Sequence, residues 1–235
     1  MKIAVIPARG GSKRIPRKNI KDFCGKPMIA WAITIAQESG LFDHIIVSTD
    51  DEEIADIGRK WGAEIPFLRP LELADDDTPT VPVVAHAVKS CIDNGWVVEY
   101  ACCIYPCVPF LEIDDLKSSI DFAKNKDTDF IYSVTEYPHP VQRSMRRFPG
   151  GEMQFLSPEC ELTRTQDLEK SYHDAGQFYW GKARAWLEHK RMHTGGLGMV
   201  IPNWRIVDID SMDDWVRAEN LYKANFLFSQ AKVKK

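Results

Sequence analysis

Residues 3–20, IAVIPARGGSKRIPRKNI, join a short apolar run to a basic loop rich in glycine. The run at 3–6 has the continuous apolar pattern of a buried strand in a parallel sheet. In the loop, Gly10 and Gly11 permit positive φ and a close approach of the backbone to a ligand. The neighbouring amides and Ser12 can donate hydrogen bonds to an anion.

Five cations crowd this loop, although the formal net charge of the chain is −4. They are Arg9, Lys13, Arg14, Arg17 and Lys18. Amide donors, cations and little side-chain bulk are what a bound polyphosphate requires. A basic, glycine-rich loop can equally be a solvated turn, and the spacing fits neither the P-loop pattern nor Gly-x-Gly-x-x-Gly. The residues alone therefore leave both interpretations open.

A more specific pattern runs through the same loop, which resembles that of the CMP-sugar synthetases, the cytidylyltransferases that activate nonulosonic acids and Kdo. The matching residues are Ala8-Arg9-Gly10-Gly11-Ser12-Lys13, Pro16, Lys18 and Asn19. In that family the loop holds the triphosphate of CTP. The resemblance implies phosphate-binding roles for Arg9, Gly10, Gly11, Ser12, Lys13 and Lys18. It also implies a role near the base for Asn19, and catalytic roles for Arg9 and Lys13.

Composition bounds the kind of protein. At 235 residues the chain is long enough for one large domain with a substantial core. Its acidic balance argues against nucleic-acid binding through bulk positive charge and favours small anionic ligands. Apolar runs are too short for a signal peptide or a membrane span, so a cytoplasmic protein without membrane contact is expected. Six cysteines without CxxC spacing predict buried thiols, and the basic end at 232–235 is expected to fray.

Strand and helix patterns alternate along most of the chain. Apolar strand patterns occur at 45–47, 100–105 and 130–135. Helices are expected at about 27–40, 52–62, 81–92 and 113–126, with Asp50 as the cap of the second. This alternation predicts an α/β fold with a doubly wound, mostly parallel sheet. In the resembled family the fold is of the nucleotide-diphospho-sugar transferase type.

The alternation fails between residues 137 and 172. This segment contains several prolines and the Pro149-Gly150-Gly151 turn, and residues 153–156 have the pattern of one arm of a small hairpin. An excursion of this length is usually functional or disordered. In the resembled family the corresponding region is a dimerisation arm that reaches over the partner's site, which implies a homodimer and a lid over the sugar. A surface insertion without function is the alternative.

Arg69 would be read as a surface residue from its sequence context alone. In the resembled family, however, the region of the Arg-Pro pair and the Asp-Thr turn folds over the nucleotide base. The resemblance therefore implies that Arg69 contacts cytosine, with Thr78 and Thr80 nearby.

Two aspartates near the end of the chain form a second candidate site. Residues 207–210, VDID, alternate as in a strand, so Asp208 and Asp210 are expected on one face. Such a pair suits magnesium, which prefers oxygen ligands and commonly binds one or two carboxylates together with substrate phosphates. Alternatively, Asp210 or Ser211 caps the last helix, where Ser211 and Asp214 resemble a capping box. A matching aspartate pair in CMP-sugar synthetases favours the metal.

One loop departs from the sialic acid enzymes of this family. They carry Gln-Pro-Thr-Ser-Pro-Leu-Arg, whereas this chain has YPCVPFL at 105–111. A loop after a strand of an open α/β sheet faces the site. Because apolar side chains replace polar ones in this loop, it offers few partners for hydroxyls, and a less hydroxylated acid such as pseudaminic acid is expected. The blocks 137–143, 166–169 and 172–181 also resemble the pseudaminate-activating members of the family. N-acetylneuraminic, legionaminic or Kdo acid, or a non-catalytic nucleotide-sugar sensor, are alternatives.

The sugar-binding residues are expected within these blocks. Gln142, Arg143 and Arg164 could bind carboxylate or acetamido oxygens, since arginine suits a bidentate carboxylate. The body of the sugar would be lined by Tyr105, His173, Gln177, Phe178 and Tyr179. His173 could equally be a structural residue.

The expected reaction is an in-line attack by the anomeric hydroxyl of the acid sugar on the α-phosphorus of CTP. Catalysis would consist of positioning and charge stabilisation. Arg9 and Lys13 would neutralise the triphosphate, and magnesium on Asp208 and Asp210 would activate the hydroxyl.

Overall fold

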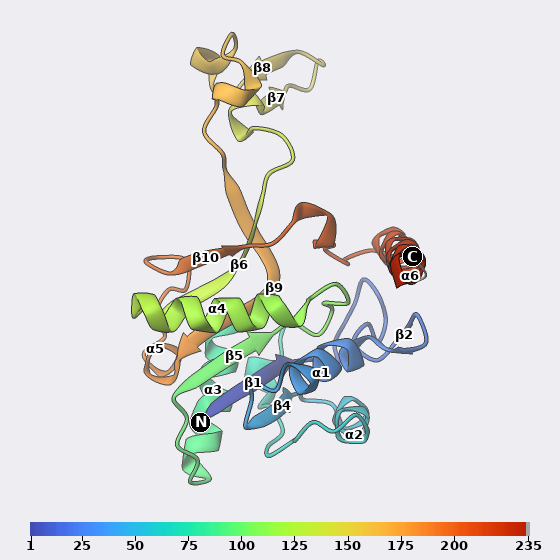
Figure 1. Cartoon of the computed structure of the whole chain (residues 1–235), viewed down its shortest axis with the longest axis vertical. Helices are drawn as coiled ribbons and strands as arrows, with labels where there is room; N and C mark the ends of the chain where they lie inside the picture. Colours follow the sequence, from blue (N-terminus) through green and yellow to red (C-terminus); the bar gives the residue numbers. More distant parts are fainter. Residues whose placement is uncertain (234–235) are drawn as a thin grey trace.

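A six-stranded sheet forms the centre of the molecule. The computed structural model describes residues 1–233, with the side chains of residues 1–225. The six strands are β1 (Lys2–Pro7), β4 (His44–Ser48), β5 (Tyr100–Ile104), β6 (Phe130–Glu136), β9 (Tyr172–Lys182) and β10 (Leu197–Val200). They lie in the order β10-β6-β9-β5-β1-β4 (Figure 1).

The sheet is mostly parallel, as predicted. β1 pairs in parallel with β4 and β5, and β10 pairs in parallel with β6. β9 runs antiparallel to both of its neighbours, β5 and β6. This strand returns the chain from the irregular segment after β6, where the sequence patterns did not indicate a strand.

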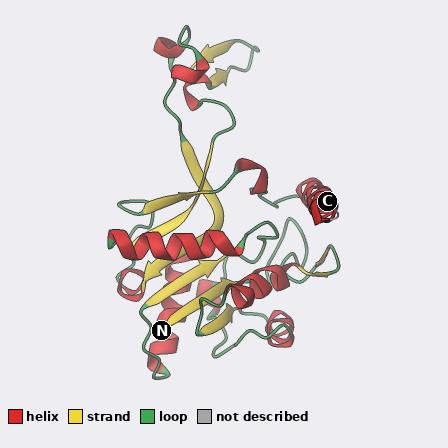
Figure 2. Cartoon of the chain, in the orientation of Figure 1, coloured by secondary structure: helices red, strands yellow, loops and turns green. Residues whose placement is uncertain are grey.

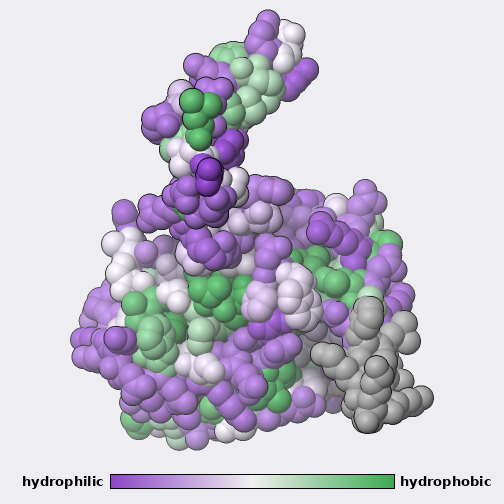
Figure 3. Space-filling view, turned by 45° about the horizontal axis from the view of Figure 1, so that its top comes forward, coloured by the Kyte–Doolittle hydropathy of each residue, from purple (hydrophilic) through white to green (hydrophobic). Residues whose placement is uncertain are grey.

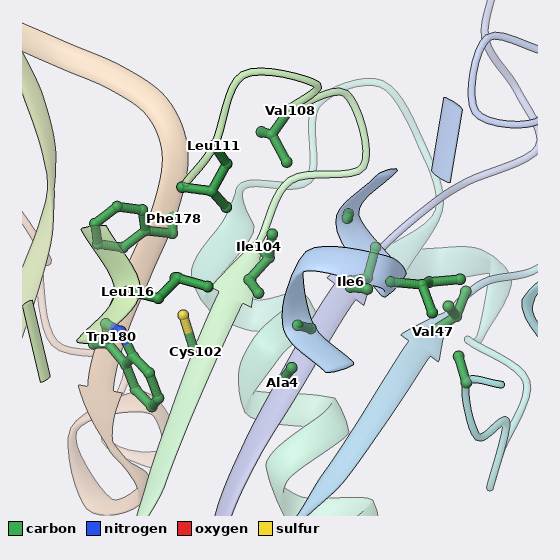
Figure 4. Packing of buried hydrophobic residues seen from close by; sticks show 14 of the residues in the cluster. Ala4, Ile6, Val47, Cys102, Ile104, Val108, Leu111, Leu116, Phe178 and Trp180 are labelled. Atoms are coloured by element: carbon green, nitrogen blue, oxygen red, sulfur yellow. The ribbon is translucent and has the colours of Figure 1, made fainter. Parts of the chain in front are cut away.

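Helices cover both faces of the sheet (Figure 2). They are α1 (Met28–Ser39), α2 (Glu52–Lys60), α3 (Thr80–Asp93), α4 (Ile113–Lys126), α5 (Ala183–Leu187) and α6 (Met212–Val233). Buried side chains of α1, α2 and α4 join one core cluster, part of which Figure 4 shows, and those of α3 and α5 join another. Successive side chains of a strand point to opposite faces. Ala4 and Ile6 of β1 therefore enter the first cluster, and Ile3 and Val5 enter the second.

The cap of α2 differs from the expectation. Asp51, and not Asp50, caps this helix, because its carboxylate accepts a hydrogen bond from the amide of Ile54 at 3.0 Å. Asp50 instead accepts a hydrogen bond from the amide of Gly10, also at 3.0 Å. Asp50 thus stabilises the loop after β1, and Asp51 stabilises the start of α2.

Residues 137–171 leave the body of the molecule between β6 and β9, and we call them the arm (Figure 1). The arm contains an antiparallel pair, β7 (Met145–Arg147) and β8 (Met153–Phe155), which confirms the hairpin expected near 153–156. Several apolar side chains of the arm are exposed, including Leu156 and Leu162, and Figure 3 shows apolar residues on its surface.

The last helix packs against an aromatic cluster. Trp215 and Tyr222 of α6 meet the ring of Phe23 edge-on, with centroid distances of 5.5 and 6.0 Å. Phe23 belongs to a short antiparallel pair, β2 (Asp22–Phe23) and β3 (Lys26–Pro27). Of the basic end expected to fray, residues 232–233 lie in the last turn of α6 and 234–235 lie outside the described residues. Within the described part of the chain, none of the helices has the length and apolar character needed to cross a bilayer.

Candidate functional site

A cavity of about 260 Å³ opens beyond the carboxyl end of β1, at the point where the chain connections turn from one side of that strand to the other. We call it the basic cavity. Its polar lining consists of Arg9, Ser12, Lys13, Arg14, Lys18, Asn19, Arg69, Thr78, Thr80, Tyr105 and Asp210. Every residue expected to bind CTP therefore lines this cavity, except the two glycines.

The glycines of the loop act differently from the expectation. Neither Gly10 nor Gly11 has a positive φ. A Cβ added to Gly10 would lie 2.7 Å from Oδ2 of Asp51, and the amide of Gly10 already donates to Asp50. Gly10 is thus needed for the close approach of the loop to the start of α2, and because its amide already has a protein acceptor, the phosphate-binding role expected at this position stays a prediction.

Arg9 and Lys13 both form ion pairs with the carboxylate of Asp76. The hydrogen bond from Lys13, followed by that from Arg9, lowers the pKa of Asp76. A carboxylate of the protein therefore occupies the two cations that are the first candidates for binding a triphosphate.

Two other cations of the loop have protein partners. Arg17 makes a bidentate ion pair with Asp51, and this hydrogen bonding lowers the pKa of Asp51 to about 2. The pair ties the loop to the N-terminus of α2. Arg14 contacts Oδ2 of Asp210 at 2.7 Å and so joins the loop to the end of the chain.

Arg69 is buried in the wall of the basic cavity, with 5% of its surface exposed. It donates hydrogen bonds to the hydroxyl and the carbonyl of Ser48 and forms no ion pair with the described residues. Burial lowers its pKa to about 10. The surface position read from the sequence context alone is wrong, and the inward position implied by the resemblance agrees with the structure. A buried guanidinium without a carboxylate partner can still bind an acceptor on a ligand.

A second cavity of about 390 Å³ adjoins the first. We call it the carboxylate cavity. The two share Lys18, Asn19, Tyr105, Pro106 and Asp210. The second is completed by Cys107, His173, Asp174, Ala175, Gly176, Ile206, Val207, Asp208 and Ile209.

Asp208 and Asp210 both line the carboxylate cavity, and Asp210 lines the basic cavity as well. Residues 206–210 do not form the expected strand and pair with no strand in the described part of the chain. The alternation nevertheless holds, because Ile209 is buried in the core between the two acids. Partial burial, and next the charge of Asp210, raise the pKa of Asp208. Lys18 donates to the carbonyl of Ile209 at 2.8 Å and fixes this segment to the basic loop.

The chemistry of this pair fits a divalent cation. Two carboxylates that repel each other beside a cavity would both be stabilised by a shared cation. Among the described residues, no group of three or more His, Cys, Asp or Glu is arranged to hold a metal. A carboxylate pair suits magnesium, which commonly takes one or two carboxylates and completes its coordination with phosphates and water.

The helix-capping alternative is confirmed for Ser211 and Asp214. The hydroxyl of Ser211 accepts from the amide of Asp214 at 3.2 Å, and the carboxylate of Asp214 accepts from the amide of Ser211 at 2.8 Å. This reciprocal box starts α6 and leaves the carboxylates of Asp208 and Asp210 free of that role, although the amide of Asp210 also donates to the carboxylate of Asp214 at 3.2 Å.

The residues expected on the sugar side separate into two groups. Tyr105 and His173 line the carboxylate cavity. Phe178 does not, because it is fully buried in the first core cluster, and Gln177 is buried with its amide donating to the carbonyl of Arg205. Tyr179 is also buried, and its hydroxyl donates to Asp174. The expectations of direct sugar contact for Gln177 and Phe178 are wrong, since β9 is a central strand covered on both faces. Tyr179 lines a further cavity beside Tyr105 and Asp174, and its contact with the sugar stays a prediction.

The apolar loop at 106–111 reaches the cavity with two of its residues. Pro106 and Cys107 line the carboxylate cavity. Val108 and Leu111 instead pack into the first core cluster (Figure 4), and Phe110 packs into the aromatic cluster below α6. The apolar character of this loop is thus largely a property of the core.

Gln142, Arg143 and Arg164 all lie in the arm, and none of them lines either cavity. The amide of Gln142 donates to the carbonyl of Glu169, and the guanidinium of Arg143 donates to the carbonyl of Thr163. Within a single chain these residues lie apart from Tyr105 and His173, because the arm projects from the body (Figure 1), and their role in binding the sugar stays a prediction.

Two acids of the site were missed in the sequence. Asp76 belongs to the acidic turn before α3, whose contact with the basic loop no local pattern indicates. Asp174 lines the carboxylate cavity and accepts hydrogen bonds from the hydroxyl of Tyr179 and the amide of Gly176. Asp174 could have been found from the sequence, because it lies in the block 172–181 that resembles the pseudaminate-activating members of the family.

A family model described as cytidylyltransferase matches residues 3–179. A pseudaminic acid cytidylyltransferase of Campylobacter jejuni is 39% identical over 226 residues, which span 95% of this chain and 97% of that protein. A CMP-N,N'-diacetyllegionaminic acid synthase of Legionella pneumophila is 29% identical, with 95% and 97% covered.

Solved structures share the fold. A CMP-2-keto-3-deoxy-manno-octonic acid synthetase in complex with CTP has a TM-score of 0.69 at 14% identity, covering 95% of this chain and 99% of that chain. A 4-diphosphocytidyl-2C-methyl-D-erythritol synthase of Anaerococcus prevotii has a TM-score of 0.63 at 11% identity, covering 94% and 96%. With the matched family model and the identity to the Campylobacter enzyme, it follows that this chain belongs to the cytidylyltransferase family.

Proposed function

We propose that this chain transfers CMP from CTP to the anomeric hydroxyl of pseudaminic acid and releases pyrophosphate. The observation that carries the proposal is the junction of the two cavities, where Lys18, Asn19, Tyr105 and Asp210 belong to both. A nucleotide in the basic cavity and an acid sugar in the carboxylate cavity would meet at this junction.

The basic cavity supplies groups for each part of CTP. Arg9, Ser12, Lys13 and Lys18 are suited to the triphosphate, because they combine cations with a hydroxyl donor. Arg69 and Asn19 are suited to the base, since both are buried polar side chains in the cavity wall. Thr80 donates to or accepts from the hydroxyl of Tyr105 at 2.6 Å and orients that ring between the cavities.

We propose that Asp208 and Asp210 hold magnesium. Bound there, the ion would neutralise charge on the α-phosphate and lower the pKa of the sugar hydroxyl. Lys18 donates a hydrogen bond to the carbonyl of Ile209, between the two aspartates, and its ammonium group lies 3.8 Å from Oδ1 of Asp210.

The reaction needs no covalent enzyme intermediate. The anomeric oxygen forms a bond to the α-phosphorus, the bond from that phosphorus to the bridging oxygen breaks, and pyrophosphate leaves with the electron pair. The proton of the hydroxyl passes to solvent. Arg9 and Lys13 stabilise the charge that grows on the pyrophosphate, which requires that they leave Asp76.

Identity to the Campylobacter jejuni enzyme supports pseudaminic acid as the substrate. The cavity wall formed by Pro106, Cys107 and Ala175 supports it as well, because these residues offer few partners for extra hydroxyls. A second candidate is a legionaminic acid, favoured by the similarity to the Legionella enzyme.

Pyrophosphate release from CTP and magnesium tests this proposal, with pseudaminic, N,N'-diacetyllegionaminic and N-acetylneuraminic acids compared. Release with pseudaminic acid far above the others is the expected result, and release with none of them would refute the proposal. Asp208→Ala should abolish turnover, whereas the matched control Asp213→Ala, on an acid of the first turn of α6 that lines neither cavity, should keep it.

We further propose that the chain acts as a homodimer in the cytoplasm, where CTP is available. The exposed apolar side chains of the arm, such as Met153, Leu156 and Leu162, support a second copy as their cover. Gln142, Arg143 and Arg164 would then approach the partner's sugar. Light scattering should report a dimer that Leu162→Asp weakens, and a monomeric wild-type chain would refute this assignment.

A further inference from the structure

The segment that carries Asp208 and Asp210 is held in position by side-chain contacts and not by strand pairing. It begins with a short 3-10 helix, η5 (Asn203–Arg205), and continues through 206–210 without a strand partner among the described residues. A strand in a sheet is held in register by its ladder of hydrogen bonds. This segment has no such ladder, so its position depends on the burial of Ile209 in the core and on individual contacts at its two ends.

Arg205 makes the strongest contact at the upstream end. Its side chain is 6% exposed and binds Asp115 of α4 through two parallel hydrogen bonds, Nη1 to Oδ2 at 2.7 Å and Nη2 to Oδ1 at 2.9 Å. Nη1 also lies 2.9 Å from Oε2 of Glu112. A bidentate pair of this kind fixes orientation as well as distance.

The backbone of Arg205 is held at the same time. Its carbonyl accepts a hydrogen bond from Nε2 of Gln177, a buried residue of the central strand β9, at 3.0 Å. At the downstream end, Lys18 donates to the carbonyl of Ile209. The two aspartates thus lie between an anchor on the body of the fold and an anchor on the basic loop.

We infer that Arg205 is a positioning residue for the Asp208–Asp210 pair, an inference that rests on the proposed function. Arg205 lines neither the basic nor the carboxylate cavity and acts through the two residues that separate it from Asp208. A carboxylate pair must be held in one geometry to bind a metal tightly, and loss of the supporting contacts around ligands typically lowers metal affinity about 10–100-fold.

Arg205→Lys tests this role, because lysine keeps the charge but cannot form the bidentate pair. Binding of Mn²⁺ in the presence of CTP, followed by electron paramagnetic resonance, reports the carboxylate pair without requiring turnover. We expect Mn²⁺ affinity to fall about 10-fold or more and the magnesium concentration for half-maximal rate to rise in parallel. The KM for CTP at saturating magnesium should stay near the wild-type value.

Two further variants make the result decisive. Asp115→Asn removes the partner carboxylate and should weaken Mn²⁺ binding in the same direction. Arg184→Lys is the matched control, since Arg184 is exposed and pairs with Asp129 outside both cavities. Wild-type Mn²⁺ affinity in folded Arg205→Lys and Asp115→Asn would overturn the inference. A wild-type chain that binds Mn²⁺ but releases no pyrophosphate would instead refute the proposed function alone.

Discussion

Arg205→Met should cost the protein a large part of its stability. The substitution keeps much of the side-chain volume but leaves Asp115, 13% exposed, without its cation. Removal of one partner of a buried ion pair costs about 3–5 kcal/mol. Asp115 retains a hydrogen bond from the amide of Glu112, and Glu112 itself is exposed, so we expect the lower end of that range, about 3 kcal/mol.

This free energy corresponds to a measurable shift in melting temperature. With an unfolding entropy of about 2.1 cal/mol/K per residue, 235 residues give about 0.5 kcal/mol/K, and the midpoint should fall by about 6 °C. Calorimetry and urea denaturation both measure the change. Arg205→Met/Asp115→Leu should recover most of the loss, because replacing both charges by apolar groups leaves neither unpaired.

The exposed pair of Arg59 and Asp56 on α2 provides the control. Arg59→Met should cost less than about 1 kcal/mol, because both side chains remain in water. If Arg205→Met were as stable as Arg59→Met, the pair with Asp115 would not anchor the segment as we describe.

Three other predictions concern the site and the core. Asp76→Asn frees the two cations of the basic loop, so CTP should bind more tightly by calorimetry than to the wild type; unchanged affinity would show that Asp76 does not compete. The pKa of Asp51 is depressed to about 2, so its pair with Arg17 stabilises the fold above the ordinary carboxyl pKa and is lost as pH falls through 2. Urea midpoints between pH 5 and 2 should therefore decline less for Asp51→Asn than for the wild type, and equal slopes would contradict the linkage. Phe178→Ala should lower the unfolding free energy by about 3–5 kcal/mol in urea and leave the KM for the acid sugar unchanged, whereas the opposite pattern would return Phe178 to the sugar site.

Local features of the chain were predictable from its sequence. The apolar run at 3–6 is the buried strand β1, the helix expected at 113–126 is α4 with the same bounds, and Ser211 and Asp214 form their capping box. Such features depend on residues only a few positions apart, through periodicity, propensity and capping. The basic loop was identifiable as a candidate site through its resemblance to the loop of the CMP-sugar synthetases, whereas its residues alone left a solvated turn open as well.

Tertiary structure decided which distant residues contact these local elements. Asp76 reaches Lys13 across 63 positions, and Asp115 reaches Arg205 across 90. The aromatic and amide residues of 177–179 read as ligand contacts, but β9 lies between β5 and β6 and directs them into buried positions. Sequence by itself determined the strand-loop elements and the kinds of group available for CTP and for the proposed metal. Which of those groups meet depends on how the sheet is ordered and covered, and that order results from packing among distant segments, which no local pattern records.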